Sequence, residues 1–113
     1  MSKYDFIERA RLYSVSVRSH IRSYKYDSLL VDDFRQLIRS SGAIGANYIE
    51  ANQCLGSKDF KLRAKIAKKE AKESAYWSAI LYEITGDEKF RGFQKESTEL
   101  ELILGGILKN YKE

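Results

Sequence analysis

The sequence predicts an all-α protein, an up-down-up-down four-helix bundle built from its 113 residues. The chain contains no proline, the residue that most often interrupts a helix. Apolar residues also recur at alternating steps of three and four, a period of about 3.5 that is typical of helices packed nearly parallel. We expect one domain over residues 1–113, with helices over residues 3–25, 29–55, 58–85 and 88–111.

The first two predicted helices each carry a single apolar stripe. The first stripe includes His20, which we expect to be a packed or rim histidine rather than a ligand or a base. Residues 26–28, Tyr-Asp-Ser, separate the two helices. The stripes are Phe6, Ala10, Tyr13, Val17, His20 and Tyr24, and then Leu30, Phe34, Leu37, Ser41, Ile44, Tyr48, Ala51 and Leu55.

The third predicted helix carries two stripes, so we expect it to pack against neighbours on two sides. One stripe is mixed, and the other consists mainly of small residues that let neighbouring helices approach closely. The mixed stripe is Ile66, Glu70, Glu73, Trp77, Ile80 and Ile84. The small stripe is Phe60, Ala64, Ala67, Ala71, Ser74, Ser78 and Leu81. The fourth helix again has one stripe: Phe90, Phe93, Ser97, Leu100, Leu104, Ile107 and Tyr111.

Capping residues mark the ends of the third and fourth helices. Ser57 is a candidate N-cap, and Asp59 in the first turn complements the helix dipole. Gly86 follows Thr85 as a candidate C-terminal stop, and Asp87 can cap the last helix.

Basic residues are unevenly distributed along the chain, although the formal net charge is only +4. Residues 1–27 contain six Lys or Arg against three Asp or Glu, and residues 57–74 contain seven against three. Such clusters attract phosphate groups. A solvated face that keeps the protein in solution is the alternative.

Polar residues also lie on a second face of the second helix. Asn47 and Glu50 lie away from its apolar seam, where they are either solvated or in contact with another helix or another subunit. Gly42 and Gly45 favour the contact, because each glycine inside a helix costs about 1 kcal/mol relative to alanine and close backbone approach compensates for that.

Glu50, Glu70 and Glu73 raise the question of a carboxylate metal site. A ferritin-like di-iron bundle needs a His three residues after a Glu, whereas Glu70 is followed at that distance by Glu73. We therefore expect no metal and favour pairing with cations. The candidates are Lys65, Lys69 and Lys72 in the same helix and Arg35 or Arg39 from the second helix.

The sequence lacks nucleotide-binding, zinc and Ser/His/Asp motifs, so we expect no enzymatic activity and no cofactor. Cys54 is the only cysteine, and we expect it to behave as a small hydrophobic residue. No apolar run approaches the roughly 20 residues that span a bilayer, and no signal-peptide stretch opens the chain. We expect a cytoplasmic protein without a membrane partner. Trp77 with Tyr76 is core or interface material or, if exposed, a surface on which bases stack.

Two segments in the middle of the chain carry the motifs of a known family. In the second helix these are Arg39, Ser40, Ser41, Gly42, Ile44, Ala46, Asn47 and Glu50. They continue with Ser57, Asp59, Phe60, Ala67, Glu70, Glu73, Ser74, Tyr76 and Trp77. The chain thereby resembles the four-helix bundle proteins encoded in 23S ribosomal RNA intervening sequences, which are related to the accessory variability determinant of diversity-generating retroelements. It departs at Ala43, where the family often has Ser, and at Ser78, where a larger apolar residue is common.

This resemblance implies a protomer that assembles into a ring-shaped homo-oligomer, a homopentamer. In the retroelement branch, such rings present a basic surface that binds nucleic acid and a reverse transcriptase. For the intervening-sequence branch the biochemical role is generally undefined, so the resemblance does not fix the partner.

Our hypothesis is a non-enzymatic oligomer whose basic residues contact the RNA or DNA backbone without reading sequence. The alternatives are a protein-interaction scaffold whose basic face only solvates the protein, and a carboxylate metalloenzyme. The candidate nucleic-acid-binding residues are Arg11, Arg18, Arg22, Lys58, Lys61, Arg63, Lys65, Lys68, Lys69 and Lys72. The candidate structural or interface residues are Asn47, Glu50, Glu70, Glu73 and Trp77.

Overall fold

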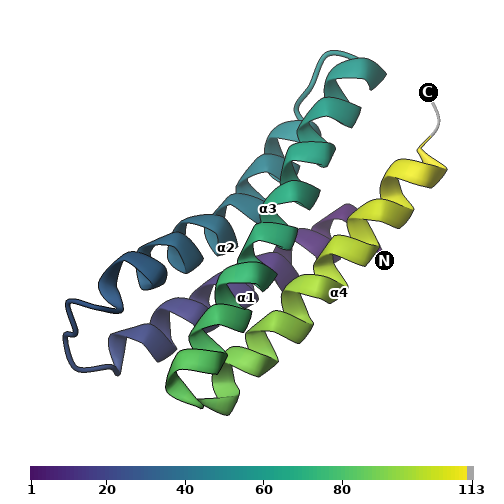
Figure 1. The fold of residues 1–113 in the computed structure, drawn as a ribbon. Helices are drawn as coiled ribbons and strands as arrows, with labels where there is room; N and C mark the ends of the chain where they lie inside the picture. Colours follow the sequence, from purple (N-terminus) through teal and green to yellow (C-terminus); the bar gives the residue numbers. More distant parts are fainter. Residues whose placement is uncertain (112–113) are drawn as a thin grey trace.

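The computed structural model describes residues 1–111 as four helices that run alternately in opposite directions (Figure 1). Their bounds are Lys3–Arg22 for α1, Val31–Ala51 for α2, Ser57–Thr85 for α3 and Glu88–Asn110 for α4. The bundle measures 47 × 20 × 19 Å. The all-α class and the four helices are as predicted; the last two residues of the predicted domain, 112 and 113, lie outside the described residues.

Helix α3 holds the bundle together. It packs along both α2 and α4, and in Figure 1 it lies between them. Helix α1 packs mainly on α2 and touches α4 less, so that α1 and α3 lie diagonally across the core. The prediction that the third helix has neighbours on two sides is therefore confirmed.

The small stripe of α3 forms the centre of the core, and all seven of its predicted residues are buried. Alanine and serine at this interface keep the helices close together. Tyr13 reaches across from α1, and its hydroxyl lies 2.6 Å from the Ser74 hydroxyl. Ser40, Ser41 and Ser97 bond to their own helices, as Ser97 does in donating to the Phe93 carbonyl at 2.9 Å, whereas the buried Ser78 hydroxyl makes no hydrogen bond of normal geometry in the described residues. The helices therefore lie close together across the core, and most of its buried polar groups have hydrogen-bond partners.

Helices α1 and α2 end earlier than predicted because each tightens into a turn. After Arg22, the Tyr24 amide donates to the carbonyl three residues back at 2.9 Å, and after Ala51 the Gln53 amide does the same at 3.0 Å. The chain then leaves the helical path, so Leu55 is fully exposed instead of lying in the apolar seam.

The ends of α3 and α4 follow the capping signals in part. Ser57 is the first residue of α3 rather than its N-cap, because Gly56 occupies the capping position with extended backbone. Gly86 ends α3 with a φ of 70°, in the left-handed region that favours glycine. Asp87 caps α4, and its side chain accepts from the Lys89 amide at 3.0 Å.

A polar and aromatic cluster joins α1 to the start of α4. Asp87 accepts hydrogen bonds from the Tyr24 hydroxyl at 2.5 Å and pairs with His20 Nε2 at 2.7 Å. The His20 ring also packs edge-on against Phe90, as expected of a rim histidine. Burial acts to raise the pKa of Asp87, but hydrogen bonds from Tyr24, the Lys89 amide and His20 outweigh it and lower that pKa.

Candidate nucleic-acid interface

A row of exposed lysines runs along the outer side of α3. The lysines follow one another at steps of three or four residues, which places them on the same side of the helix. At 1.5 Å per residue the row is about 21 Å long. The residues are Lys58, Lys61, Lys65, Lys69 and Lys72, and we call them the α3 lysine face.

The acidic residues of the same segment are paired elsewhere. Asp59 lies 3.7 Å from Arg63, and Glu70 and Glu73 both pair with Arg39 of α2. Within residues 1–111, the lysines of the α3 lysine face make no ion pair. Glu70 and Glu73 thus lie toward α2, away from the lysines, whereas Asp59 lies beside Lys58 and Lys61. With five lysines against one aspartate, the outer side keeps a net positive charge.

Two predicted basic residues of α3 are engaged within the bundle. The Arg63 guanidinium donates to Glu50 at 3.1 Å across the α2–α3 interface. Lys68 is only partly exposed, because its aliphatic stem lies along α4. Its Cε is 3.6 Å from the point where a Cβ added to Gly105 would lie. Each of these side chains contacts a neighbouring helix, so neither is part of the α3 lysine face.

The three predicted arginines of α1 lie on a different side of the bundle. Arg11 makes a two-bond pair with Glu8 at 2.5 and 2.8 Å. The Arg18 guanidinium lies over Gly42 of α2 and donates to the Ile38 carbonyl at 3.1 Å. Arg22 is exposed. Because α1 and α3 are diagonal, these arginines do not extend the α3 lysine face.

Arg39 links α2 to two carboxylates on α3. Its guanidinium donates to Glu70 at 3.0 Å and also to Glu73. Burial and the neighbouring Glu73 raise the pKa of Glu70, whose side chain is only 14% exposed. Burial also acts to raise the pKa of Glu73, but hydrogen bonds with Glu70 and Arg39 outweigh it and lower that pKa. Arg39 is one of the two arginines expected to approach; the other, Arg35, lies 3.6 Å from Asp32 instead.

The remaining predicted interface residues contact neighbouring residues of the same chain. Asn47 donates to the Ala43 carbonyl of its own helix at 2.8 Å. Trp77 packs against the core, and its indole N–H is buried without a hydrogen bond of normal geometry in the described residues. A Cβ at Gly45 would lie 3.4 Å from the Ala10 Cβ, so the close approach expected at Gly42 and Gly45 is toward α1.

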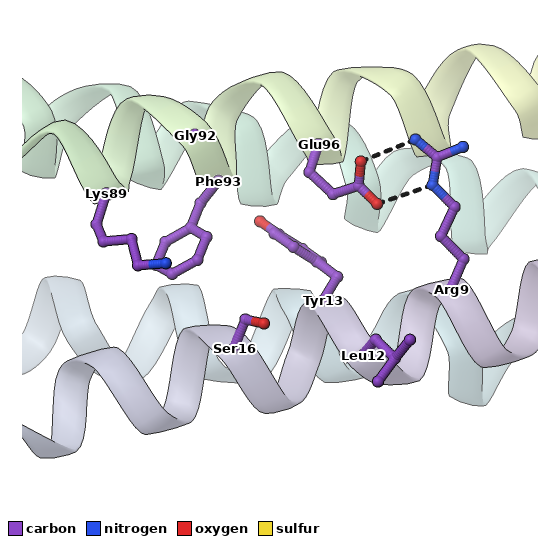
Figure 2. A pocket seen from close by; sticks show the side chains of 8 residues that line it. All are labelled: Arg9, Leu12, Tyr13, Ser16, Lys89, Gly92, Phe93 and Glu96. Atoms are coloured by element: carbon purple, nitrogen blue, oxygen red, sulfur yellow. Dashed lines mark hydrogen bonds and ion pairs between the residues drawn. The ribbon is translucent and has the colours of Figure 1, made fainter.

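A groove of about 360 Å³ lies between α1 and α4 (Figure 2). Figure 2 shows Arg9 and Glu96 joined by two hydrogen bonds, each 2.8 Å long, at one end of the groove. The Tyr13 ring crosses it, and the hydroxyl of that ring is already bonded to Ser74. In the part of the chain that the structure describes, no group of His, Cys, Asp and Glu side chains is arranged to hold a metal ion. The groove's paired groups hold α1 to α4.

Tyr76 lies one helical turn beyond Lys72, on the same outer side of α3. It is 60% exposed, and its ring meets Trp77 edge-on with centroids 5.2 Å apart. From the sequence, this aromatic pair is a candidate surface for base stacking only if its rings are exposed. In the structure, Tyr76 is exposed and Trp77 is partly buried.

Comparisons with known proteins support the fold. No protein-family model and no curated protein matches the sequence. Among solved structures, the chain is similar to the crystal structure of a protein of unknown function from the S23 ribosomal protein family of Bacteroides thetaiotaomicron. The two are 27% identical with a TM-score of 0.81, over 93% of this chain and 99% of that one. The chain has an S23-like fold. Within residues 1–111, none of its helices combines the length and the apolar character needed to cross a membrane.

Proposed function

We propose that this chain is a non-enzymatic, oligomeric accessory protein that binds the backbone of RNA or DNA through the α3 lysine face. The observation that carries the proposal is the separation of charge around α3. The five lysines of the α3 lysine face are exposed, while Glu70 and Glu73 pair with Arg39 of α2 and Asp59 pairs with Arg63. Long flexible ammonium groups on a rigid helix suit contacts with phosphates that fix position without reading bases.

Counterion release predicts how steeply the binding affinity falls with salt concentration. If each lysine of the α3 lysine face neutralises one phosphate, log Kobs falls with log[salt] with a slope of about −4.5 on duplex DNA and about −3.5 on a single strand. Raising the salt from about 50 to about 200 mM would then weaken duplex binding roughly 500-fold and single-strand binding roughly 130-fold. A steep salt dependence is therefore the signature of this interface.

Oligomerisation is the second part of the proposal. The S23-like fold supports extending the resemblance to the 23S rRNA intervening-sequence family, and with it a cytoplasmic, ring-shaped homopentamer. Such a ring would display five copies of the α3 lysine face, and a net charge of +4 per chain would give about +20 per ring. A reverse transcriptase partner would follow only for a member of the retroelement branch. Light scattering should give five times the chain mass of 13.1 kDa; a monomer mass at working concentration would contradict the assembly.

Charge reversal tests the interface directly. The variant Lys61→Glu, Lys65→Glu, Lys69→Glu should lose binding to labelled RNA and DNA, measured by fluorescence anisotropy at about 50 mM salt. The matched control is Lys3→Glu, Lys25→Glu, Lys89→Glu, which changes net charge equally at exposed lysines outside the face.

The control should keep most of its affinity, and both variants should keep the wild-type mass and helical circular dichroism. Equal loss in the two variants would mean that only net charge matters. Absence of wild-type binding at low salt would instead favour the protein-interaction scaffold.

A further inference from the structure

The α3 lysine face continues into an exposed aromatic ring. Tyr76 follows Lys72 by four residues and Lys69 by seven, spacings that keep side chains on one side of a helix. From Lys58 to Tyr76 the surface is about 27 Å long. A straight row of cations thus ends at a tyrosine that is 60% exposed.

The geometry around Tyr76 keeps its ring accessible. The ring and Trp77 pack in a T-shaped arrangement, at 76° between planes, and such a contact covers at most one face of the Tyr76 ring. Trp77 is itself packed against the core, so it supports the ring from a fixed position. Tyrosine has few rotatable bonds and a flat π face, which suits stacking at small entropic cost.

Proteins that bind single strands combine these two elements, a cationic track for the backbone and aromatic rings for unpaired bases. In a duplex the bases are already stacked on one another, so Tyr76 could not reach a base face there. We infer that Tyr76 is a base-stacking residue and that the ligand of the α3 lysine face is single-stranded RNA or DNA. This inference rests on the nucleic-acid function proposed above, and it adds the strandedness of the ligand.

The size of the effect follows from stacking on one ring. Removing an aromatic side chain that stacks on a base weakens single-strand binding about 5- to 150-fold, and the exposed position of Tyr76 places the expected loss at the lower end, about 5- to 20-fold. Duplex binding should not change, because it uses only the lysines.

The test compares Tyr76→Ala, Tyr76→Phe and the matched control Tyr26→Ala on two probes. The probes are a labelled single strand of about 12 uridines or thymidines, within the usual site size, and a duplex of equal length. Tyr26 is 80% exposed and lies in the α1–α2 connection, outside the α3 lysine face. We expect loss on the single strand for Tyr76→Ala alone, with Tyr76→Phe and Tyr26→Ala near wild type.

Several outcomes overturn the inference. An unchanged single-strand affinity in Tyr76→Ala, while the lysine charge reversal still abolishes binding, would refute stacking and leave the proposed function standing. Equal losses on single strand and duplex, or a changed mass by light scattering, would show that Tyr76 acts in folding or assembly. No binding of either probe by the wild type would remove both proposals together.

A second readout is independent of affinity. A single strand carrying 5-iodouracil crosslinks on irradiation to an aromatic side chain that it stacks on, and mass spectrometry locates the modified peptide. The crosslink should map to Tyr76 and disappear in Tyr76→Ala. A crosslink that maps only to other tyrosines would overturn the assignment.

Discussion

Replacing Arg39 with methionine removes the cation that faces Glu70 and Glu73, while much of the apolar stem is kept. Arg39 is 48% exposed, so the ion pair itself contributes only about 0.2–1 kcal/mol. The two glutamates, three residues apart, would then repel each other by about 0.2–0.5 kcal/mol. Glu70 is mostly buried and would lose a charged donor, which adds up to about 1 kcal/mol after allowance for exposure. We expect a total loss of about 1–2 kcal/mol at pH 7.

The loss should depend on pH in a defined direction. Without Arg39, burial and Glu73 raise the folded-state pKa of Glu70 further above its unfolded value of about 4.3. A raised folded pKa contributes stability that is present below the unfolded value and is lost as pH rises through the folded value. The difference in unfolding free energy between wild type and Arg39→Met should therefore be small near pH 4 and largest near pH 7.

Urea unfolding followed by far-UV circular dichroism at the two pH values measures this difference. Arg35→Met is the matched control, because Arg35 is 74% exposed and only 3.6 Å from Asp32; it should cost less than about 0.5 kcal/mol. Adding Glu70→Gln to Arg39→Met should recover part of the loss. A loss of the same size at pH 4 and pH 7, or none at pH 7, would refute the electrostatic reasoning.

Two further substitutions probe the fold that holds the interface. Tyr13→Phe should cost about 1 kcal/mol, since the Ser74 hydroxyl loses its partner but can turn to a backbone carbonyl. Burial raises the pKa of Tyr13, so wild-type stability should fall as pH rises above about 10 and the gap to Tyr13→Phe should narrow there in urea titrations. Asp87→Asn should cost about 0.3–1 kcal/mol at pH 7, because it removes the negative charge at the start of α4 and beside His20, while Asn can still accept the capping hydrogen bond. The pKa of Asp87 is lowered, so its contribution is present above about 3.9 and is lost as pH falls through the folded value; thermal melts at pH 7 and pH 2.5 should show the gap closing in acid.

The buried side of each helix could be predicted because periodicity reports burial directly. Residues such as Ala67 and Ser74 recur on one side of α3, and only a helix with close neighbours needs small residues there. The helix ends were less predictable. Tyr24 and Leu55 continue the apolar spacing, but the chain has already tightened into a turn at each of these points. A pattern of spacing does not show where backbone hydrogen bonds stop.

The partners of long charged side chains were the hardest to predict. Arg18 belongs to a basic segment of sequence, yet its guanidinium folds onto α2 above Gly42. Lys68 follows the same spacing as the outer lysines, but its stem lies along α4. The sequence could suggest Arg39 as a partner for Glu70, but choosing it over Arg35 required the relative position of two helices.

The salt dependence of binding tests the central claim that lysines on the outer side of α3 contact phosphates. We predict a linear plot of log Kobs against log[salt] with a slope of about −3.5 or steeper on a single strand. Lys65→Ala should make that slope shallower by about 0.7 or more, while Lys25→Ala leaves it unchanged. A slope near zero, or the same slope for wild type and Lys65→Ala, would contradict the account.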